Sequence, residues 1–130
     1  MTWRLTLLAV MMASACVGDE TVAGYGGAGK IWVLDELDGA AFSAHATMTF
    51  PKRNQIAGAA PCNSYGGEMS TPYPWFDAPA LASTRRACPE LAAEQKFLTA
   101  LGEMTQSEVL GNVLILRNDA GREMVFKAGD

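Results

Sequence analysis

The stretch GAAPCNSYGGEMSTPYPWFDAPALASTRRACP, residues 58–89, determines the architecture that we predict for this chain. Cys62 and Cys88 lie near its two ends, and the residues between them are rich in glycine, proline, serine and aromatic side chains. This composition is typical of short strands joined by tight turns, because no long helical period runs through it. A disulfide between Cys62 and Cys88 would close a loop of roughly 27 residues and stabilise a small domain by about 3–4 kcal/mol. We therefore predict that this disulfide holds the domain together.

The N-terminus has the features of an export signal. Arg4 precedes an apolar run, residues 5–12, and small residues follow up to Cys16. A positive residue, a short apolar run and small residues before a cleavage site are typical of a secretory signal peptide, here residues 1–15. The run is too short to span a membrane, which takes about 20 apolar residues. We therefore expect an exported chain.

Cys16 is the odd cysteine of three. The sequence Ala-Ser-Ala-Cys at residues 13–16 resembles a bacterial lipobox, with alanine in place of the usual leucine. An odd cysteine in an oxidising compartment needs an explanation, and lipidation of Cys16 leaves one clean pair. The alternative is a free or intermolecular Cys16. We expect a lipidated N-terminus and a flexible, glycine-rich tether over residues 16–29, with an r.m.s. span of roughly 20 Å.

Several short motifs occur in a fixed order along the chain. They are Trp32-x-Leu34-x-x-Leu37-x-Gly39, then Gly58-x-x-Pro61-Cys62-Asn63-x-Tyr65-x-Gly67, then Ser83-Thr84-Arg85-x-Ala87-Cys88-Pro89, and finally Glu94. In this order they resemble the META domain of the HslJ-like heat-shock lipoproteins. The match covers about residues 30–127, nearly the whole mature chain, and we predict that residues 30–128 form the domain. Pro61 departs from the family pattern, which usually has glycine there. The resemblance implies a stress-related envelope lipoprotein without established catalysis. Val17 stands where inner-membrane retention signals of bacterial lipoproteins usually have aspartate, so resemblance to them implies sorting to the outer membrane.

Apolar periodicity predicts the secondary structure. Alternation or apolar runs between turn residues indicate strands over residues 30–34, 46–50, 55–59, 103–110, 112–117 and 124–127. Residues 89–101 are predicted as the one helix, with Gly102 as its C′ residue. Gly58 is expected to mark a bulge or a close backbone approach. We predict an α+β fold in which one helix packs across a curled antiparallel β-sheet, or partial barrel, of six to eight short strands. A closed barrel without a helix is the alternative.

Glu94 projects from the middle of the apolar face of the predicted helix. That face is formed by Leu91, Phe97, Leu98 and Leu101. A carboxylate among apolar residues is costly unless it is paired, and the nearest basic residues in sequence are Arg85 and Arg86. We predict a partly buried ion pair between Glu94 and Arg85. The alternative role, a general acid of raised pKa, lacks a partner residue that would complete a site.

The polar and aromatic residues of the central stretch are predicted to be structural. Asn63 follows Cys62 directly and is expected to fix the turn, since asparagine tolerates the left-handed conformation and bonds nearby backbone. Tyr65 is expected to be a packed ring with a bonded hydroxyl. Tyr73, Trp75 and Phe76 are expected to pack in the core or at its rim, while a ligand- or partner-binding groove remains the alternative.

The remaining composition argues against several functional classes. His45 is the single histidine, so the usual imidazole metal sites and a Ser-His-Asp relay are not expected. The formal net charge is −4 and no basic stripe occurs, so we expect no nucleic-acid partner. We expect no enzyme activity and no cofactor.

These observations lead to two hypotheses of function. The first is a lipid-anchored, non-catalytic module on the periplasmic side of the outer membrane that binds an unknown envelope protein; a soluble periplasmic protein is the alternative location. The second is a carrier that holds a small apolar or peptide ligand between sheet and helix.

Overall fold

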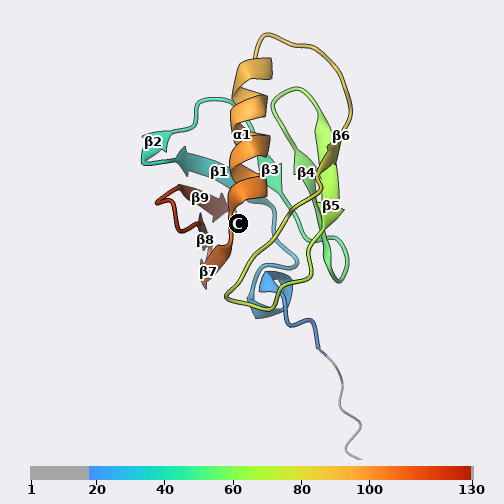
Figure 1. Cartoon of the computed structure of the whole chain (residues 1–130), viewed down its shortest axis with the longest axis vertical. Coiled ribbons are helices and arrows are strands. Elements are labelled where there is room, and N and C mark those ends of the chain that lie inside the picture. Colours follow the sequence, from blue (N-terminus) through green and yellow to red (C-terminus); the bar gives the residue numbers. More distant parts are fainter. Residues whose placement is uncertain (1–17, 130) are drawn as a thin grey trace, which may run out of the picture.

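The computed structural model describes residues 18–129 (Figure 1). A short 3-10 helix, η1 (Val22–Tyr25), comes first and the α-helix α1 (Leu91–Glu103) comes late in the chain. The strands are β1 (Trp32–Leu37), β2 (Ala40–Ala41), β3 (Thr47–Met48), β4 (Gln55–Ala59), β5 (Ser64–Glu68), β6 (Ala82–Ser83), β7 (Gln106–Leu110), β8 (Val113–Arg117) and β9 (Glu123–Ala128).

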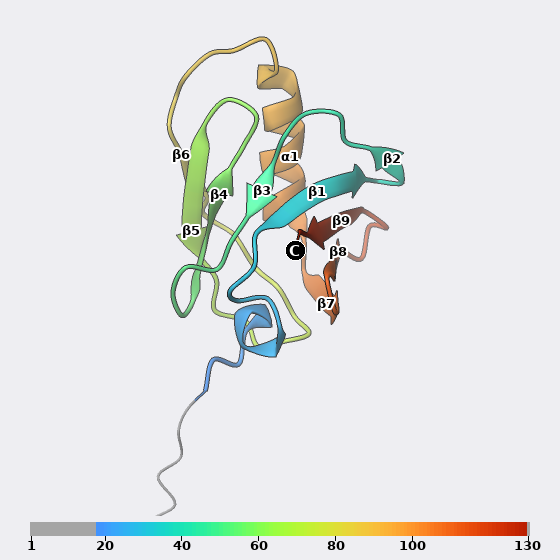
Figure 2. The same cartoon turned by 180° about the vertical axis from the view of Figure 1, so that it is seen from behind.

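All strand pairs are antiparallel, and they form two sheets. The larger sheet has the order β2-β1-β9-β8-β7, and β3 also pairs with β1. The smaller sheet has the order β4-β5-β6, and a bridge between Thr49 and Ala57 connects it to the β3 segment. The strands thus form a curled arrangement that does not close, and α1 packs across its concave side (Figures 1 and 2). The predicted α+β class is confirmed, although the described residues contain nine strands rather than six to eight.

The core lies between α1 and the larger sheet. Alternate residues of the strands point inward, and Trp32, Leu34, Leu114, Leu116, Met124 and Phe126 are all at most 3% exposed. Phe97, Ala100 and Leu101 of α1 are fully buried against them. The period of two predicted this face for Trp32 and Leu34, whereas residues 112–117 are apolar on both faces and their inward face is seen only in the structure.

The end of α1 differs from the prediction. Gly102 does not end the helix, since α1 continues to Glu103 and Met104 takes the C-cap position. The extra residues bring Glu103 to within 2.9 Å of Arg122 and deliver Met104, 1% exposed, into the core. Burial and pairing of these two side chains outweigh the tendency of glycine to end a helix.

The prediction of a flexible tether is wrong for residues 21–28. Val22 and Ala23 are 1% and 5% exposed, and the indole Nε1 of Trp32 donates a hydrogen bond to the carbonyl of Gly27, 2.9 Å away. A Cβ on Gly27 would lie 2.9 Å from the Phe50 ring, so this glycine permits close packing instead of flexibility. The predicted signal peptide, residues 1–15, and the predicted lipidation site, Cys16, lie outside the described residues.

Candidate functional site

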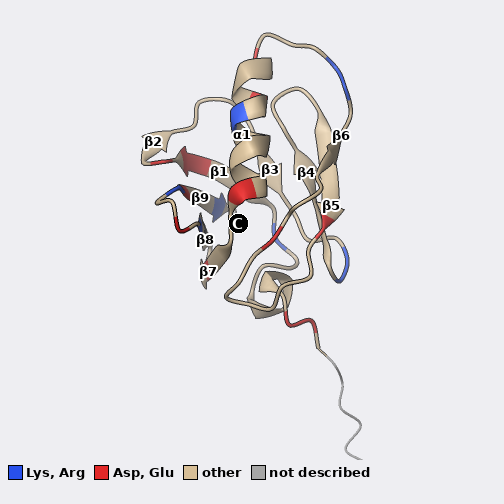
Figure 3. Ribbon diagram, viewed as in Figure 1, with Lys and Arg blue, Asp and Glu red and all other residues tan. Residues whose placement is uncertain are grey.

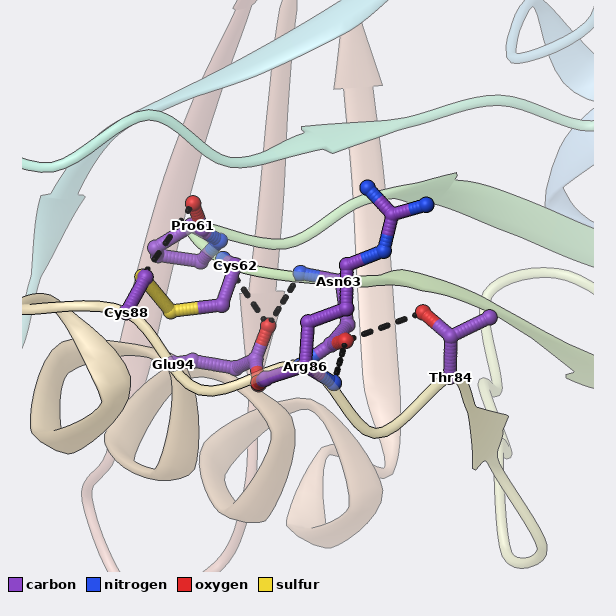
Figure 4. Close-up of a disulfide and its surroundings, with 7 residues drawn as sticks. All are labelled: Pro61, Cys62, Asn63, Thr84, Arg86, Cys88 and Glu94. Carbon is purple, nitrogen blue, oxygen red and sulfur yellow. Dashed lines mark hydrogen bonds between the residues drawn. A yellow bond between two sulfur atoms is a disulfide. The ribbon is translucent and has the colours of Figure 1, made fainter.

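The predicted disulfide is present between Cys62 and Cys88. The two Cα atoms are 5.7 Å apart, and the bond joins the turn before β5 to the loop before α1. Figure 4 shows that the side chain of Glu94 points from α1 toward this turn. The disulfide and Glu94 therefore both hold this turn.

Glu94 is paired with the backbone and with an amide, not with arginine. Its Oε1 accepts hydrogen bonds from the backbone N–H of Cys62 at 3.0 Å and of Asn63 at 2.7 Å, and its Oε2 accepts one from Asn63 Nδ2 at 2.6 Å. Glu94 is only 3% exposed, and three N–H donors satisfy its buried carboxylate. The predicted ion pair with Arg85 is wrong, because no salt bridge within residues 18–129 involves Glu94.

Asn63 extends this network to the loop before α1. Its Oδ1 accepts hydrogen bonds from Thr84 Oγ1 at 3.0 Å and from the backbone N–H of Arg86 at 2.6 Å. Its Nδ2 also donates to the carbonyl of Arg86 at 3.0 Å (Figure 4). Asn63 thus has a structural role at the turn, but not by the predicted means, because it is not among the residues of positive φ and its amide bonds distant segments instead of nearby backbone. We call Cys62, Asn63, Thr84, Arg86 and Glu94 the Glu94 cluster.

Tyr65 and Gly58 connect β5, β4 and β3. The hydroxyl of Tyr65 donates to the carbonyl of Thr47 at 2.7 Å, and its ring contacts Phe97 edge-on with centroids 5.4 Å apart. Burial raises the pKa of Tyr65, so this hydroxyl stays protonated. A Cβ on Gly58 would lie 2.0 Å from the Thr47 carbonyl oxygen, which confirms the predicted close approach. Gly67 has a similar role, because a Cβ there would lie 3.0 Å from a backbone carbonyl of the loop before β6.

The motif residues thus use their polar groups to build the fold. Within residues 18–129 every buried side-chain nitrogen or oxygen has a hydrogen-bond partner. In the same part of the chain no three His, Cys, Asp or Glu side chains are placed to hold a metal ion, and His45 is exposed. Lys and Arg residues are spread over separate elements (Figure 3). The buried polar groups of the Glu94 cluster therefore join elements together and are satisfied by one another.

The three aromatic residues predicted to pack in the core or at its rim have different environments. Phe76 is 3% exposed and belongs to the core, whereas Trp75 is 54% exposed. Tyr73 is half-buried and stacks on Tyr25, with ring centroids 4.8 Å apart and planes 11° apart. The prediction of core packing holds for Phe76, while Trp75 offers its ring to solvent.

These aromatic residues lie along the free edge of β7. Trp75 forms an antiparallel bridge with Gln106, and the backbone N–H of Phe76 donates to the carbonyl of Thr105 at 2.9 Å. The backbone N–H of Ser107 donates to the carbonyl of Pro74 at 2.6 Å. Residues 73–76 therefore occupy the edge of the larger sheet and hold Trp75 at a fixed place on it.

A depression of about 380 Å³ lies beside Trp75. Its walls include Tyr73, Pro74, Gln106, Ser107, Glu108, Ile115 and Arg117. Glu108 and Arg117 form a salt bridge of 3.1 Å within it. The walls that β7 and β8 contribute to this depression were not predicted, because only the sheet pairing brings Ile115 and Arg117 next to residues 73–75, about forty positions earlier. The sole sequence signal is that residues 112–117 are apolar on both faces.

Asp77 fixes the loop that carries Trp75. Its Oδ1 accepts hydrogen bonds from the backbone N–H of Ser70 at 2.8 Å and of Thr71 at 3.1 Å, and from Thr71 Oγ1 at 2.8 Å. Burial alone would raise the pKa of Asp77, but these hydrogen bonds outweigh it and hold the pKa below its usual value. Asp77 therefore closes a loop around residues 72–76.

A second depression, of about 510 Å³, lies between the β1–β2 hairpin and α1. Apolar side chains, including Leu37, Phe42 and Ala93, line it together with Lys96 and Arg122. Arg122 binds Asp38 at 2.9 Å, and this guanidinium lowers the pKa of Asp38. The volume is within the range of small-molecule sites, roughly 300–1,000 Å³.

Comparisons with known proteins give one family match and two solved structures of similar fold. A family model described as the META domain matches residues 27–130. A protein from Burkholderia xenovorans, solved by NMR, has a similar structure with a TM-score of 0.67 and 24% identity, over 90% of this chain and 93% of that one. A DUF4847 family protein from Bacteroides vulgatus, solved by crystallography, shares the fold with a TM-score of 0.63 and 11% identity, over 82% of this chain and 96% of that one. No curated protein matches the chain.

Proposed function

The chain belongs to the META domain family, and we propose that it is an exported, lipid-anchored module of the cell envelope that acts by binding, without catalysis. We place its lipid on Cys16 and its location on the periplasmic side of the outer membrane. The resemblance to heat-shock lipoproteins makes a role during envelope stress part of this proposal.

The observation that carries the proposal is the contrast between the Glu94 cluster and the surface around Trp75. The residues that define the family motifs bond to one another and leave no buried polar side-chain atom without a partner in residues 18–129. The ring of Trp75, in contrast, is held in place by backbone hydrogen bonds and yet is 54% exposed. Exposed aromatic residues fixed on a rigid scaffold are typical of binding surfaces.

The disulfide supports an oxidising compartment. Bridges such as that between Cys62 and Cys88 form and persist in exported proteins and are rare in the cytosol. A domain with this bridge therefore suits the periplasm. No helix within residues 18–129 has the length and apolar character needed to cross a bilayer, and in our proposal the lipid on Cys16 supplies the attachment.

Mass spectrometry of the full chain, extracted from the membrane fraction of its own host, tests this proposal. We expect cleavage before Cys16, a diacyl or triacyl addition on Cys16, and a mass two hydrogens lower for the Cys62–Cys88 bond. A matched Cys16→Ser variant should move to the soluble fraction with its disulfide intact. An unmodified Cys16 in a soluble wild-type chain would refute the anchor.

A second candidate function is a carrier of a small apolar ligand. The centre of the predicted site is filled, because Phe97, Leu101 and Phe126 are fully buried where sheet and helix meet. The depression beside Phe42 and Lys96 is the observation that favours a carrier, and it would suit an apolar molecule with an anionic group. Native mass spectrometry separates the two candidates, since a carrier would show extra mass that leaves on gentle activation and that a Lys96→Glu variant loses.

A further inference from the structure

Four large apolar side chains are strongly exposed in the described part of the chain. They are Tyr25, Ile31, Trp75 and Leu110, which are 56%, 62%, 54% and 56% exposed. Single exposed apolar residues are ordinary, but a group of them on one region marks an interaction surface. We call these four residues the apolar rim.

All four residues lie around β7. Leu110 ends β7, and the Nζ of Lys30, next to Ile31, donates a hydrogen bond to the carbonyl of Gly111 at 2.8 Å. Trp75 is bridged to Gln106 at the other end of the strand.

Tyr25 joins the same region through Tyr73. The two rings are stacked, and the hydroxyl of Tyr73 accepts a hydrogen bond from the backbone N–H of Val109 at 3.2 Å. Tyr25 ends η1, so η1 itself lies beside β7, and a Cβ on Gly26 would lie 3.0 Å from Val109 Cγ1. The apolar rim is thus contributed by segments far apart in sequence that the fold brings to one strand.

The N-terminal chain enters the domain at this region. The described chain begins at residue 18 beside η1, away from the N-terminal end of α1 (Figures 1 and 2). The carbonyl of Glu20 accepts a hydrogen bond from the backbone N–H of Tyr73 at 2.7 Å, and Thr21 is 3% exposed. Four residues lie between Cys16 and Thr21, and the five steps from one Cα atom to the next reach at most about 18 Å. A lipid on Cys16 therefore brings the bilayer close to the apolar rim.

The chemistry of the apolar rim suits the bilayer surface. Tyrosine and tryptophan have an apolar body and a polar edge, and both are enriched where membranes meet water. The charged group beside Trp75 has no excess of positive charge, because Arg117 is salt-bridged to both Glu108 and Glu123, and the chain has a net charge of −4. The contact is therefore apolar in nature, and it does not require anionic lipid.

We infer that the apolar rim is a membrane-contact surface, through which the anchored domain lies against its own bilayer in one orientation. This inference rests on the proposed anchoring, and it names the bilayer as the partner of the exposed aromatic surface.

The test uses the mature chain, residues 16–130, with Cys16 coupled to a maleimide lipid in phosphatidylcholine vesicles. This artificial anchor makes the test independent of natural lipidation. The mature chain has two tryptophans, Trp32, which is fully buried, and Trp75. We expect brominated acyl chains to reduce the Trp75 emission by about half, because an interfacial indole lies near them. Iodide should quench the anchored chain less than the free chain, with little dependence on salt.

Variants assign the signal to the apolar rim. Trp75→Phe should abolish the bromine effect and leave the emission of Trp32. Tyr25→Ser with Leu110→Ser changes two exposed residues and should restore iodide quenching of Trp75, whereas Ala92→Ser on the exposed side of α1 should not. Hydrogen exchange gives a second measurement, in which anchoring should slow exchange at residues 22–31, 72–76 and 108–112 but not at residues 40–45.

Three results are decisive. Unchanged iodide quenching and unchanged exchange on vesicles would overturn the inference, and slower exchange of residues 72–76 only in the presence of an envelope protein would overturn it in favour of a protein partner. Docking by the artificially anchored chain would support the inference even if mass spectrometry showed native Cys16 to be unmodified, a result that would reject only the proposed anchor.

Discussion

Glu94→Gln is the sharpest test of how this domain is held together. Glutamine keeps one oxygen that can accept the backbone N–H groups of Cys62 and Asn63. Its other terminal atom becomes an NH₂ group, which would face the Nδ2 donor of Asn63, 2.6 Å from the present oxygen. Asn63 cannot turn its amide without losing the bonds that Thr84 and Arg86 make to its oxygen. The substitution therefore sets two donors against each other in a buried place.

The size of the effect follows from the hydrogen bonds. Those to a charged group contribute about 1.5–3 kcal/mol each, roughly twice the neutral value. The substitution weakens two bonds and loses a third, while removing the charge lowers the desolvation cost of Glu94. We expect a net loss of about 2–4 kcal/mol in the free energy of unfolding, which lowers a urea midpoint by about 1–2 M.

The assay is urea unfolding at neutral pH with the disulfide intact, followed by the fluorescence of Trp32. Glu68→Gln is the matched control, because Glu68 is exposed on β5 and the same change there should cost at most about 0.5 kcal/mol. A Glu94→Gln chain within about 0.5 kcal/mol of the wild type would refute the argument. In that case the three short contacts would contribute little.

Three further predictions use the same urea assay. Cys62 and Cys88 are 26 residues apart, and breaking their bond should lower the free energy of unfolding by about 3.5 kcal/mol. The bond can be broken with a reductant or by replacing both cysteines with alanine. Equal urea midpoints with and without reductant would contradict this prediction. Gly58→Ala should lower the free energy of unfolding by more than about 2 kcal/mol, because the new Cβ would lie 2.0 Å from a backbone oxygen of β3. Gly102→Ala lies inside α1, where the nearest atom beyond the helix backbone is 3.7 Å from the new Cβ, and should raise the free energy of unfolding by about 0.5–1 kcal/mol. Effects of the same sign would be evidence against the packing described. Asp77→Asn should cost about 1 kcal/mol at neutral pH. The pKa of Asp77 is lowered in the folded state, so the contribution of Asp77 to stability is complete above its unfolded pKa of about 3.9 and disappears as the pH falls through its folded pKa. A stability difference between wild type and Asp77→Asn that persists at a pH of about 2 would count against this explanation.

The parts of the fold that were predictable are those that follow from local patterns. Trp32 with Leu34, and Met48 with Phe50, alternate with more exposed residues and are buried in the structure. The turns at residues 37–39 and 118–121 contain glycines of positive φ, Gly39 and Gly121. Such signals depend on each residue and its close neighbours, so one sequence is enough to read them.

The parts that were not predictable depend on contacts between distant segments. Glu94 was correctly recognised as buried and in need of a partner, but its partners are backbone N–H groups, which every residue has and which therefore leave no mark in a sequence. The abundance of glycine in residues 24–29 suggested flexibility. In the structure, position 27 needs a residue without a Cβ, because Phe50 packs against it. Local composition cannot separate these two causes of a glycine.

The packing of residues 21–28 also changes what the anchor would do. A domain on a flexible tether of fourteen residues would sample every orientation at a distance from the membrane. The four residues between Cys16 and the buried Thr21 leave far less freedom. A shorter linker also raises the effective concentration of the domain surface at the membrane, as long as the linker can still span the distance required. Each apolar side chain near the entry point then needs only a weak affinity for lipid to fix the orientation. Residues of the β1–β2 hairpin line the depression beside Phe42 and Lys96. The β2 end of this hairpin lies well away from η1 in Figures 1 and 2, so in this orientation it would face away from the bilayer. If the apolar rim binds lipid, the surface left for a soluble partner is therefore the hairpin end of the domain, and partner searches should begin with substitutions there.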